Sequence, residues 1–136
     1  MFWVFDPIAE KVVFTETLAD ATGMPGVERV PGTNHIWLAE PKGLRRFDPQ
    51  TLKWAQTLAW PKPAGAPATI SASDASGNSA WFTTGSTVVR LDDGATPSAH
   101  AAFTAPQTVG SMAAGTDGQL YFTQGVEVWS APQKAR

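Results

Sequence analysis

The sequence predicts an all-β fold, namely a partial β-propeller of about three four-stranded antiparallel blades. Three observations predict it: short runs of alternating apolar and polar residues, turn residues between those runs, and repetition of the whole pattern about every 40 to 44 residues. Hydrophobic residues make up 43% of the 136 residues, which indicates one globular domain rather than a disordered chain. No segment carries a convincing helical period.

Two anchors define the repeat. The first is the aromatic pairs Trp37-Leu38, Trp81-Phe82 and Tyr121-Phe122, which lie 44 and 40 residues apart. The second is an apolar strand that ends in a turn, written "FWVFDP", "LRRFDP", "VVRLDD" and "VEVWSAP". Together they divide a single domain, 1–136, into blade-like repeats at about 1–26 (partial), 27–60, 69–104 and 110–132.

Each complete unit is expected to contain four strands, counted from the propeller axis outwards. The first strands are expected at 27–30, 69–73 and 111–114, and the second at 35–39, 80–83 and 120–123. The third strands are the turn-terminated runs at 2–7, 44–49, 88–93 and 126–132, and the fourth lie at 12–17, 54–58 and 100–104. The expected total is therefore thirteen strands, which is one more than three complete blades need.

The turns and the core follow from the same pattern. "PGTN", "DASGN" and "TDG" supply the Gly or Asn that a tight hairpin needs at positive φ, and "DPQT" places Pro49 after an Asp that can bond the backbone ahead of it. Trp37, Trp81 and Tyr121 are expected to pack between adjacent blades, one large aromatic per blade. Small residues in "TISAS" and "GSMAAG" suit innermost strands, which crowd around a channel.

The repeat resembles a known family. The units "SDASGNSAWFTTGSTVVRLDDG", "GTDGQLYFTQGVEVWSAP" and "GTNHIWLAEPKGLRRFDPQT" resemble blades of virginiamycin B lyase-like propellers and, more loosely, of NHL and SMP-30-type propellers. The resemblance covers nearly the whole chain and implies a propeller fold. It also implies a metal-dependent chemistry that needs a His and acidic residues on one propeller face. His35 and His100 have no Asp or Glu at metal-ligand spacing, so no catalytic residue and no metal ligand is assigned.

Three blades do not close a ring, because propellers have 4 to 8 blades. Two blade faces would remain open to water, and apolar patches of that size are rare on soluble monomers. We expect a homodimer that completes a six-bladed propeller. Two alternatives stay open: another chain supplies the remaining blades, or this sequence is a fragment of a longer propeller. In the dimer, one third-position strand per chain would be redundant.

A binding site is expected where the loops between second and third strands, and between blades, meet at one mouth of the channel. The candidate ligand-binding residues there are Glu40, Lys42, Trp60, Lys62, Thr84 and Gln124. Trp60 lies in the proline-rich segment "AWPKPAGAPA", which is a stiff connection. The alternative role for Trp60 is to cap the hydrophobic edge of its own blade.

The function expected from these observations is a non-enzymatic propeller module for assembly and for protein or small-ligand binding, which self-associates through open blade edges. It needs no cofactor. The alternative is a lyase-like or SMP-30-like enzyme with a divalent metal and a site completed across subunits, for which Glu28, Glu40 and His35 would be tested first. A net charge of -2 without a Lys/Arg run argues against nucleic acid and membrane partners. The small cluster Lys42, Arg45 and Arg46 is expected to be a solvated strand edge.

The compartment stays open. "MFWVFDPIAEK" has neither a basic segment nor a long apolar run, so it does not predict a signal peptide or a membrane span. As written, the chain would be cytoplasmic, whereas a processed chain or a fragment would be periplasmic or secreted. The absence of cysteine excludes disulfides and thiolate metal sites.

Overall fold

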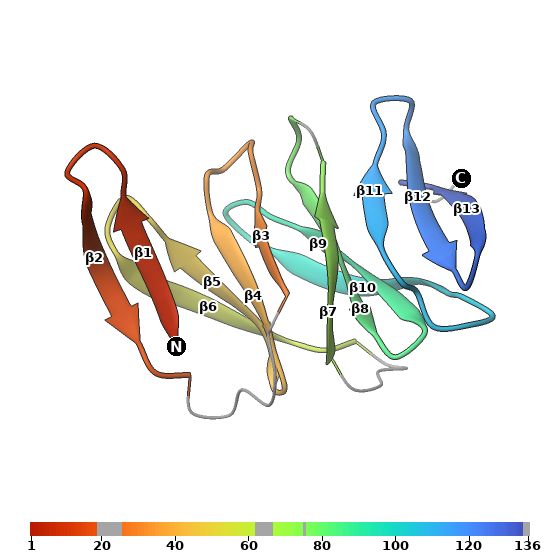
Figure 1. The fold of residues 1–136 in the computed structure, drawn as a ribbon, viewed down its shortest axis with the longest axis horizontal. Coiled ribbons are helices and arrows are strands. Elements are labelled where there is room, and N and C mark those ends of the chain that lie inside the picture. Colours follow the sequence, from red (N-terminus) through yellow and green to blue (C-terminus); the bar gives the residue numbers. More distant parts are fainter. Residues whose placement is uncertain (19–25, 62–66, 75, 135–136) are drawn as a thin grey trace.

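The computed structural model describes residues 1–18, 26–61, 67–74 and 76–134, and within them the fold is all-β (Figure 1). Thirteen strands form four antiparallel sheets, as the sequence predicts. The sheets, in chain order, are β1 (Phe2–Asp6) and β2 (Lys11–Glu16); β3 (Val27–Arg29), β4 (Ile36–Glu40), β5 (Gly43–Asp48) and β6 (Lys53–Ala59); β7 (Pro67–Ser73), β8 (Ser79–Thr84), β9 (Thr87–Asp92) and β10 (Ser98–Thr104); and β11 (Met112–Ala114), β12 (Gln119–Gln124) and β13 (Glu127–Pro132).

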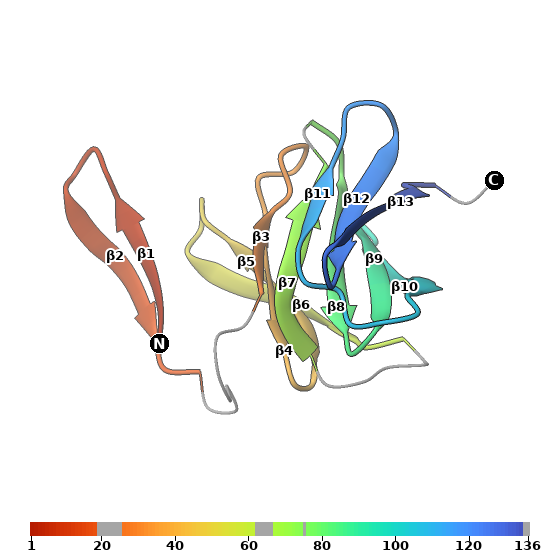
Figure 2. The same ribbon diagram turned by 45° about the vertical axis from the view of Figure 1, so that its right-hand side comes forward.

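Each sheet is a meander in which strand order follows chain order. Two sheets have four strands, the last has three, and the first is the two-stranded hairpin β1–β2. The four sheets stand in a row, with the β1–β2 hairpin at one end and β11–β13 at the other (Figures 1 and 2). The first strands β3, β7 and β11 lie nearest to one another, since β7 contacts both β3 and β11. A row of antiparallel meanders whose first strands lie closest together is the arrangement expected of propeller blades.

The β1–β2 hairpin occupies the third and fourth positions of an incomplete sheet, because it repeats the β5–β6 hairpin in detail. In β1–β2, Asp6 Oδ1 accepts hydrogen bonds from two turn amides, and Asp48 Oδ1 does the same after β5. Both turns contain a non-glycine residue at positive φ, Glu10 (φ 51°) and Leu52 (φ 56°). Both hairpins also shift register one step before the Asp. The two strands that would precede β1 in a full sheet have no counterpart in the part of the chain described.

Three apolar layers lie between the four sheets. In the middle layer, Trp37 and Leu44 of the first four-stranded sheet meet residues of the next sheet, among them Phe82 and Leu91. The layer after it joins the second four-stranded sheet to β11–β13, and the layer before it joins the β1–β2 hairpin to β3–β6. Alternation along each strand sends successive side chains into the layers on either side. The inner sheets therefore bury both faces.

Trp37 and Trp81 are buried, with exposed fractions of 0% and 1%. Tyr121 occupies the equivalent position on β12, since it pairs with Ser130 of β13 as Trp81 pairs with Arg90 of β9. Tyr121 is nevertheless 38% exposed, so within the described residues it does not pack between two sheets. The reason is positional: Trp37 and Trp81 each point at the following sheet, whereas the described residues place no further sheet after β11–β13.

The layers predict where truncation is costly. We expect Trp81→Ala to lower the free energy of unfolding by about 3–5 kcal/mol, because it removes a large ring from a filled layer and leaves a cavity. The matched control is Val126→Ala in the β12–β13 turn, which is fully exposed and should change stability by less than about 0.5 kcal/mol. Urea denaturation followed by tryptophan fluorescence and far-UV circular dichroism measures both. Equal midpoints for the two variants would contradict the layered core.

Candidate functional site

Three of the predicted ligand-binding residues are the last residues of equivalent strands. Glu40, Thr84 and Gln124 end β4, β8 and β12, so they lie at the same end of three successive sheets. Their side chains differ in access. Thr84 and Gln124 are buried, whereas Glu40 stays partly accessible and accepts a hydrogen bond from Arg45 at 3.3 Å. Lys42 follows in the exposed β4–β5 turn. Glu40, Lys42, Thr84 and Gln124 thus share one end of the fold, but Thr84 and Gln124 are buried rather than open to a ligand.

Thr84 and Gln124 carry buried polar atoms without a hydrogen-bond partner, namely Thr84 Oγ1 and Gln124 Nε2. The other amide atom of Gln124, Oε1, accepts the main-chain N–H of Gln107 at 2.8 Å. That bond ties the connection after β10 to the end of β12. The role of Gln124 visible in this chain is therefore to hold a loop.

Trp60 is half-buried and packs against the middle apolar layer. Its indole N–H donates to the main-chain oxygen of Glu40 at 2.8 Å, which fixes the ring against the end of β4. This contact agrees with the capping role rather than with an aromatic ring offered to a ligand. Lys62, the remaining predicted residue, lies outside the described residues.

The arginine pair does not form a solvated edge, contrary to expectation. Arg45 faces the β1–β2 hairpin, where it pairs with Glu16 at 2.9 Å and stacks 3.7 Å from the centre of the Trp54 ring. Arg46 faces the opposite way and binds Asp93 of the next four-stranded sheet at 3.2 Å. Neighbouring residues on a strand point to opposite faces, so each arginine serves a different inter-sheet layer.

The most connected polar group is Asp93, just after β9. Its carboxylate is fully buried and accepts from Thr33 Oγ1 at 2.6 Å and from Arg46 Nη1 at 3.2 Å. His35 Nδ1 lies 2.9 Å from Asp93 Oδ2. Arg46 also donates to the main-chain oxygen of Gly94 at 2.9 Å. The cluster joins the β3–β4 turn of one sheet to the β9–β10 turn of the next.

The cluster stabilises the charged form of Asp93. Burial by itself raises the pKa of this carboxyl group, but donors from Thr33, Trp37 and His35 together with the Gly94 amide outweigh it, and the pKa lies below its ordinary value. The Trp37 indole N–H acts only through its proximity, because it meets no acceptor at hydrogen-bond geometry. Asp93 is therefore an ionised anchor between sheets rather than a proton donor.

A hollow of about 410 Å³ opens beside this cluster, lined by Arg29, Thr33, Asn34, His35, Asp48, Pro49 and Gln50. The Thr33 hydroxyl donates to the Asp93 carboxylate, whose lowered pKa makes it a weak base. Asp48 caps its own turn, and the Gln50 amide holds the pKa of Asp48 below its ordinary value. The hollow is polar, but its titratable groups are engaged in structural bonds.

The metal trio of the enzyme alternative is not assembled within this chain. Glu28 accepts from the Ser71 hydroxyl at 2.9 Å, Glu40 pairs with Arg45, and His35 bonds Asp93. Across residues 1–18, 26–61, 67–74 and 76–134, no group of three or more His, Cys, Asp or Glu residues is placed to hold a metal ion. His100 lies apart from all three, on β10.

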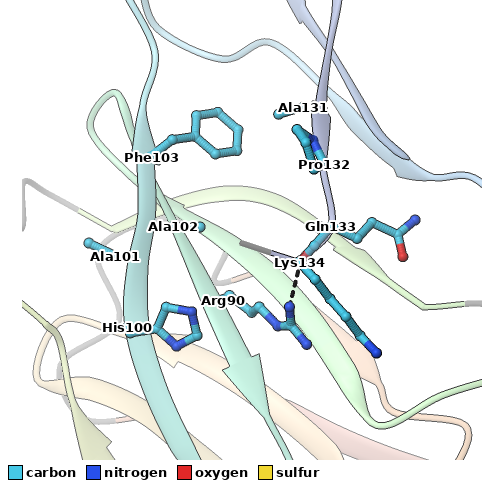
Figure 3. Close-up of a pocket in the computed structure, with 9 residues that line it drawn as sticks. All are labelled: Arg90, His100, Ala101, Ala102, Phe103, Ala131, Pro132, Gln133 and Lys134. Atoms are coloured by element: carbon cyan, nitrogen blue, oxygen red, sulfur yellow. Dashed lines mark hydrogen bonds between the residues drawn. The ribbon is translucent and has the colours of Figure 1, made fainter. Parts of the chain in front are cut away.

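A second hollow, of about 270 Å³, lies at the outer rim between β10 and the end of β13 (Figure 3). His100 and Phe103 line it from β10, and Pro132 lines it from β13. Arg90 crosses its floor and donates to the main-chain oxygen of Gln133 at 2.6 Å. This hollow borders β13, the last strand of its sheet, beside which the described residues place no fourth strand.

Large apolar side chains are exposed chiefly on the two terminal sheets. On the β1–β2 hairpin, Trp3 is 63% and Phe5 is 56% exposed. On β13, Val128 is 73% exposed, although the equivalent Val88 of β9 is completely buried. Sequence reasoning predicted two open faces, but it did not identify Trp3, Phe5 or Val128 as their residues.

No family model, curated protein or solved structure matches the chain. None of the described residues belongs to a helix with the length and apolar character needed to cross a membrane.

The Asp93 cluster yields a prediction about stability and pH. Asp93→Asn should cost about 3 kcal/mol of unfolding free energy near neutral pH, because Arg46 then loses its buried carboxylate. Because folding lowers the pKa of Asp93, its stabilisation is complete above the unfolded pKa of about 4 and is lost as pH falls through the lower folded value. The gap between wild type and variant should narrow below about pH 4.

The matched control is Asp92→Asn, one residue earlier, where the side chain is 39% exposed and pairs with Arg90. It should cost less than about 1 kcal/mol. Chemical denaturation at a series of pH values measures both variants. A larger effect of Asp92→Asn than of Asp93→Asn would show that Asp93 does not anchor the two sheets.

Proposed function

We propose that this chain is a non-enzymatic propeller module whose role is assembly: it self-associates through its two open terminal sheets and presents the completed ring for protein or small-ligand binding. The observation that carries the proposal is the contrast between buried Trp37 and Trp81 and exposed Tyr121, Trp3 and Phe5. Inner sheets bury both faces, and each terminal sheet leaves one face in water. Association that covers both faces would remove this apolar surface from solvent.

The exposure of an apolar residue in an inner sheet also supports packing against strands of a second chain. Val27 of β3 shares a sheet face with Leu38 of β4, to which it pairs. Leu38 is buried by the β1–β2 hairpin, whereas Val27 is half exposed. The hairpin has no first or second strand, so nothing described here covers the innermost part of that face. A second chain that closes the ring would bring additional strands to this region.

The enzyme alternative receives less support. The three residues it would use first, Glu28, Glu40 and His35, are bonded to three different partners in separate places. The likeness of the repeats to virginiamycin B lyase-like blades remains a hypothesis about architecture. Under it, a ligand would bind at the channel mouth, near Glu40 and Lys42, once the ring is complete.

The proposal predicts the mass of the particle in solution. Light scattering across a dilution series should give about twice 14.4 kDa, with dissociation on dilution accompanied by increased binding of an apolar dye. A dimer indicates two half-rings that close on each other. A well-folded particle of 14.4 kDa at all concentrations would refute self-association, and a polydisperse sample would support a missing partner or missing blades instead.

A further inference from the structure

The exposed faces of the first and the last sheet differ in the direction in which they point along the row of sheets. The exposed face of the β1–β2 hairpin, here the N face, carries Trp3 paired with Thr15 and Phe5 paired with Val12. The exposed face of the last sheet, here the C face, carries Tyr121 paired with Ser130 and Thr123 paired with Val128. These eight residues are uncharged, and one carboxylate borders the C face, since Asp117 accepts a hydrogen bond from the Tyr121 hydroxyl.

The N face corresponds to a face that is buried elsewhere in the chain. Phe5 precedes Asp6 and pairs with Val12, as Phe47 precedes Asp48 and pairs with Trp54. Phe47 points at the preceding element, the hairpin itself, and is fully buried there. Phe5 therefore points at the place where a preceding sheet would stand.

The C face corresponds to the opposite kind of face. Val128 pairs with Thr123 as Val88 pairs with Thr83, and Tyr121 stands where Trp81 stands on β8. Val88 and Trp81 point at the following sheet and are buried against Leu120 and Phe122. Tyr121 and Val128 therefore point at the place where a following sheet would stand.

Every layer inside the chain joins one face of each kind. In the middle layer, Trp37 on the face that points forward meets Val89 and Leu91 on a face that points backward. The same polarity holds in the layer that Trp81 enters. The N face and the C face are therefore the two sides of the kind of interface that joins successive sheets within the chain. Each of them lacks the side that would pack against it.

We propose that the C face of one copy packs on the N face of a second copy, so that the contact between chains is head-to-tail and continues the row of sheets. This inference rests on the proposed self-association and adds its polarity and its residues. A head-to-tail contact closes into a ring when the rotation per copy divides a full turn, and otherwise it grows into a filament. A two-copy ring built in this way holds eight sheets, four from each chain, rather than the six blades expected from the sequence, and it covers both N faces and both C faces.

The test uses two double variants, each of which places two lysine side chains on one of the exposed faces. The N-face variant is Trp3→Lys with Phe5→Lys, and the C-face variant is Tyr121→Lys with Val128→Lys. All four side chains are exposed, so each variant should fold as judged by circular dichroism. Matched controls are Ile8→Lys and Val126→Lys, which place a lysine at exposed apolar residues in the hairpin turns, outside both faces.

Head-to-tail pairing predicts that each double variant alone has a mass of 14.4 kDa, because each lacks one partner face everywhere. An equimolar mixture should form a particle of twice that mass containing one copy of each variant, since the intact N face of one still meets the intact C face of the other. This mixed pair keeps one contact of two, so it should dissociate at higher concentration than wild type. The two controls should keep the wild-type mass.

Cross-linking gives a second readout, and the cysteine-free sequence makes it clean. Thr15→Cys and Thr123→Cys each place a single thiol on one face of an otherwise wild-type chain. A short bis-maleimide should link the two variants to each other in preference to linking either with itself.

The outcomes distinguish a failure of the head-to-tail contact from a failure of self-association. If wild type associates but only one double variant loses association, or if the mixture stays monomeric and cross-links form mainly between like variants, the contact is not head-to-tail. If wild type itself is a folded monomer, self-association fails, and the head-to-tail contact fails with it.

Discussion

Each sheet of this chain carries apolar side chains on both of its faces, and burying both faces requires a neighbour on each side. The rest of the structure depends on this constraint. The β3–β6 and β7–β10 sheets satisfy it within the chain, and their central aromatic and aliphatic residues, among them Trp37, Phe82 and Leu91, are buried. The terminal sheets satisfy it on one side only. The exposed Phe5 and Tyr121 are the direct result, because the equivalent residues of the inner sheets, Phe47 and Trp81, are buried.

Polar contacts fix how the sheets are aligned once the apolar layers have formed. Asp93 receives Thr33, His35 and Arg46 from the neighbouring sheet, so a slide of one sheet past the other would leave a buried carboxylate without donors. Hydrophobic layers are tolerant of small displacements, whereas a buried ion with several short hydrogen bonds is not. Arg90 makes a comparable link to the next sheet through the Gln133 main chain. We regard these contacts as setting register rather than as a reactive centre.

Residue patterns along the chain predicted the positions of the strands well. They predicted less well which side chains a neighbouring sheet would bury or bond. The alternation in "SAWFTT" or "TVVRLD" is local, and it specifies a strand regardless of what lies beside it. Tyr121 shows what the repeat pattern cannot predict. Its position in the repeat predicts burial, but only a following sheet could bury it. Arg45 and Arg46 show another limit: two adjacent charges look solvated in sequence, but Arg46 finds a carboxylate 47 residues further on. Among the candidate mouth residues, Glu40, Thr84 and Gln124 end equivalent strands, whereas Thr84 and Gln124 are buried and Trp60 packs against the middle layer.

The sequence by itself determined the all-β class, the thirteen strands and the incomplete first and last units. Those features follow from side-chain periodicity and turn chemistry, which act over a few residues. Only the tertiary structure decided which side chains lie inside a layer, which carboxylate anchors two sheets, and that the two open faces point in opposite senses along the row. Those features depend on which sheet lies beside each sheet. A repeat pattern in the sequence gives no information about a packing partner that lies outside the chain.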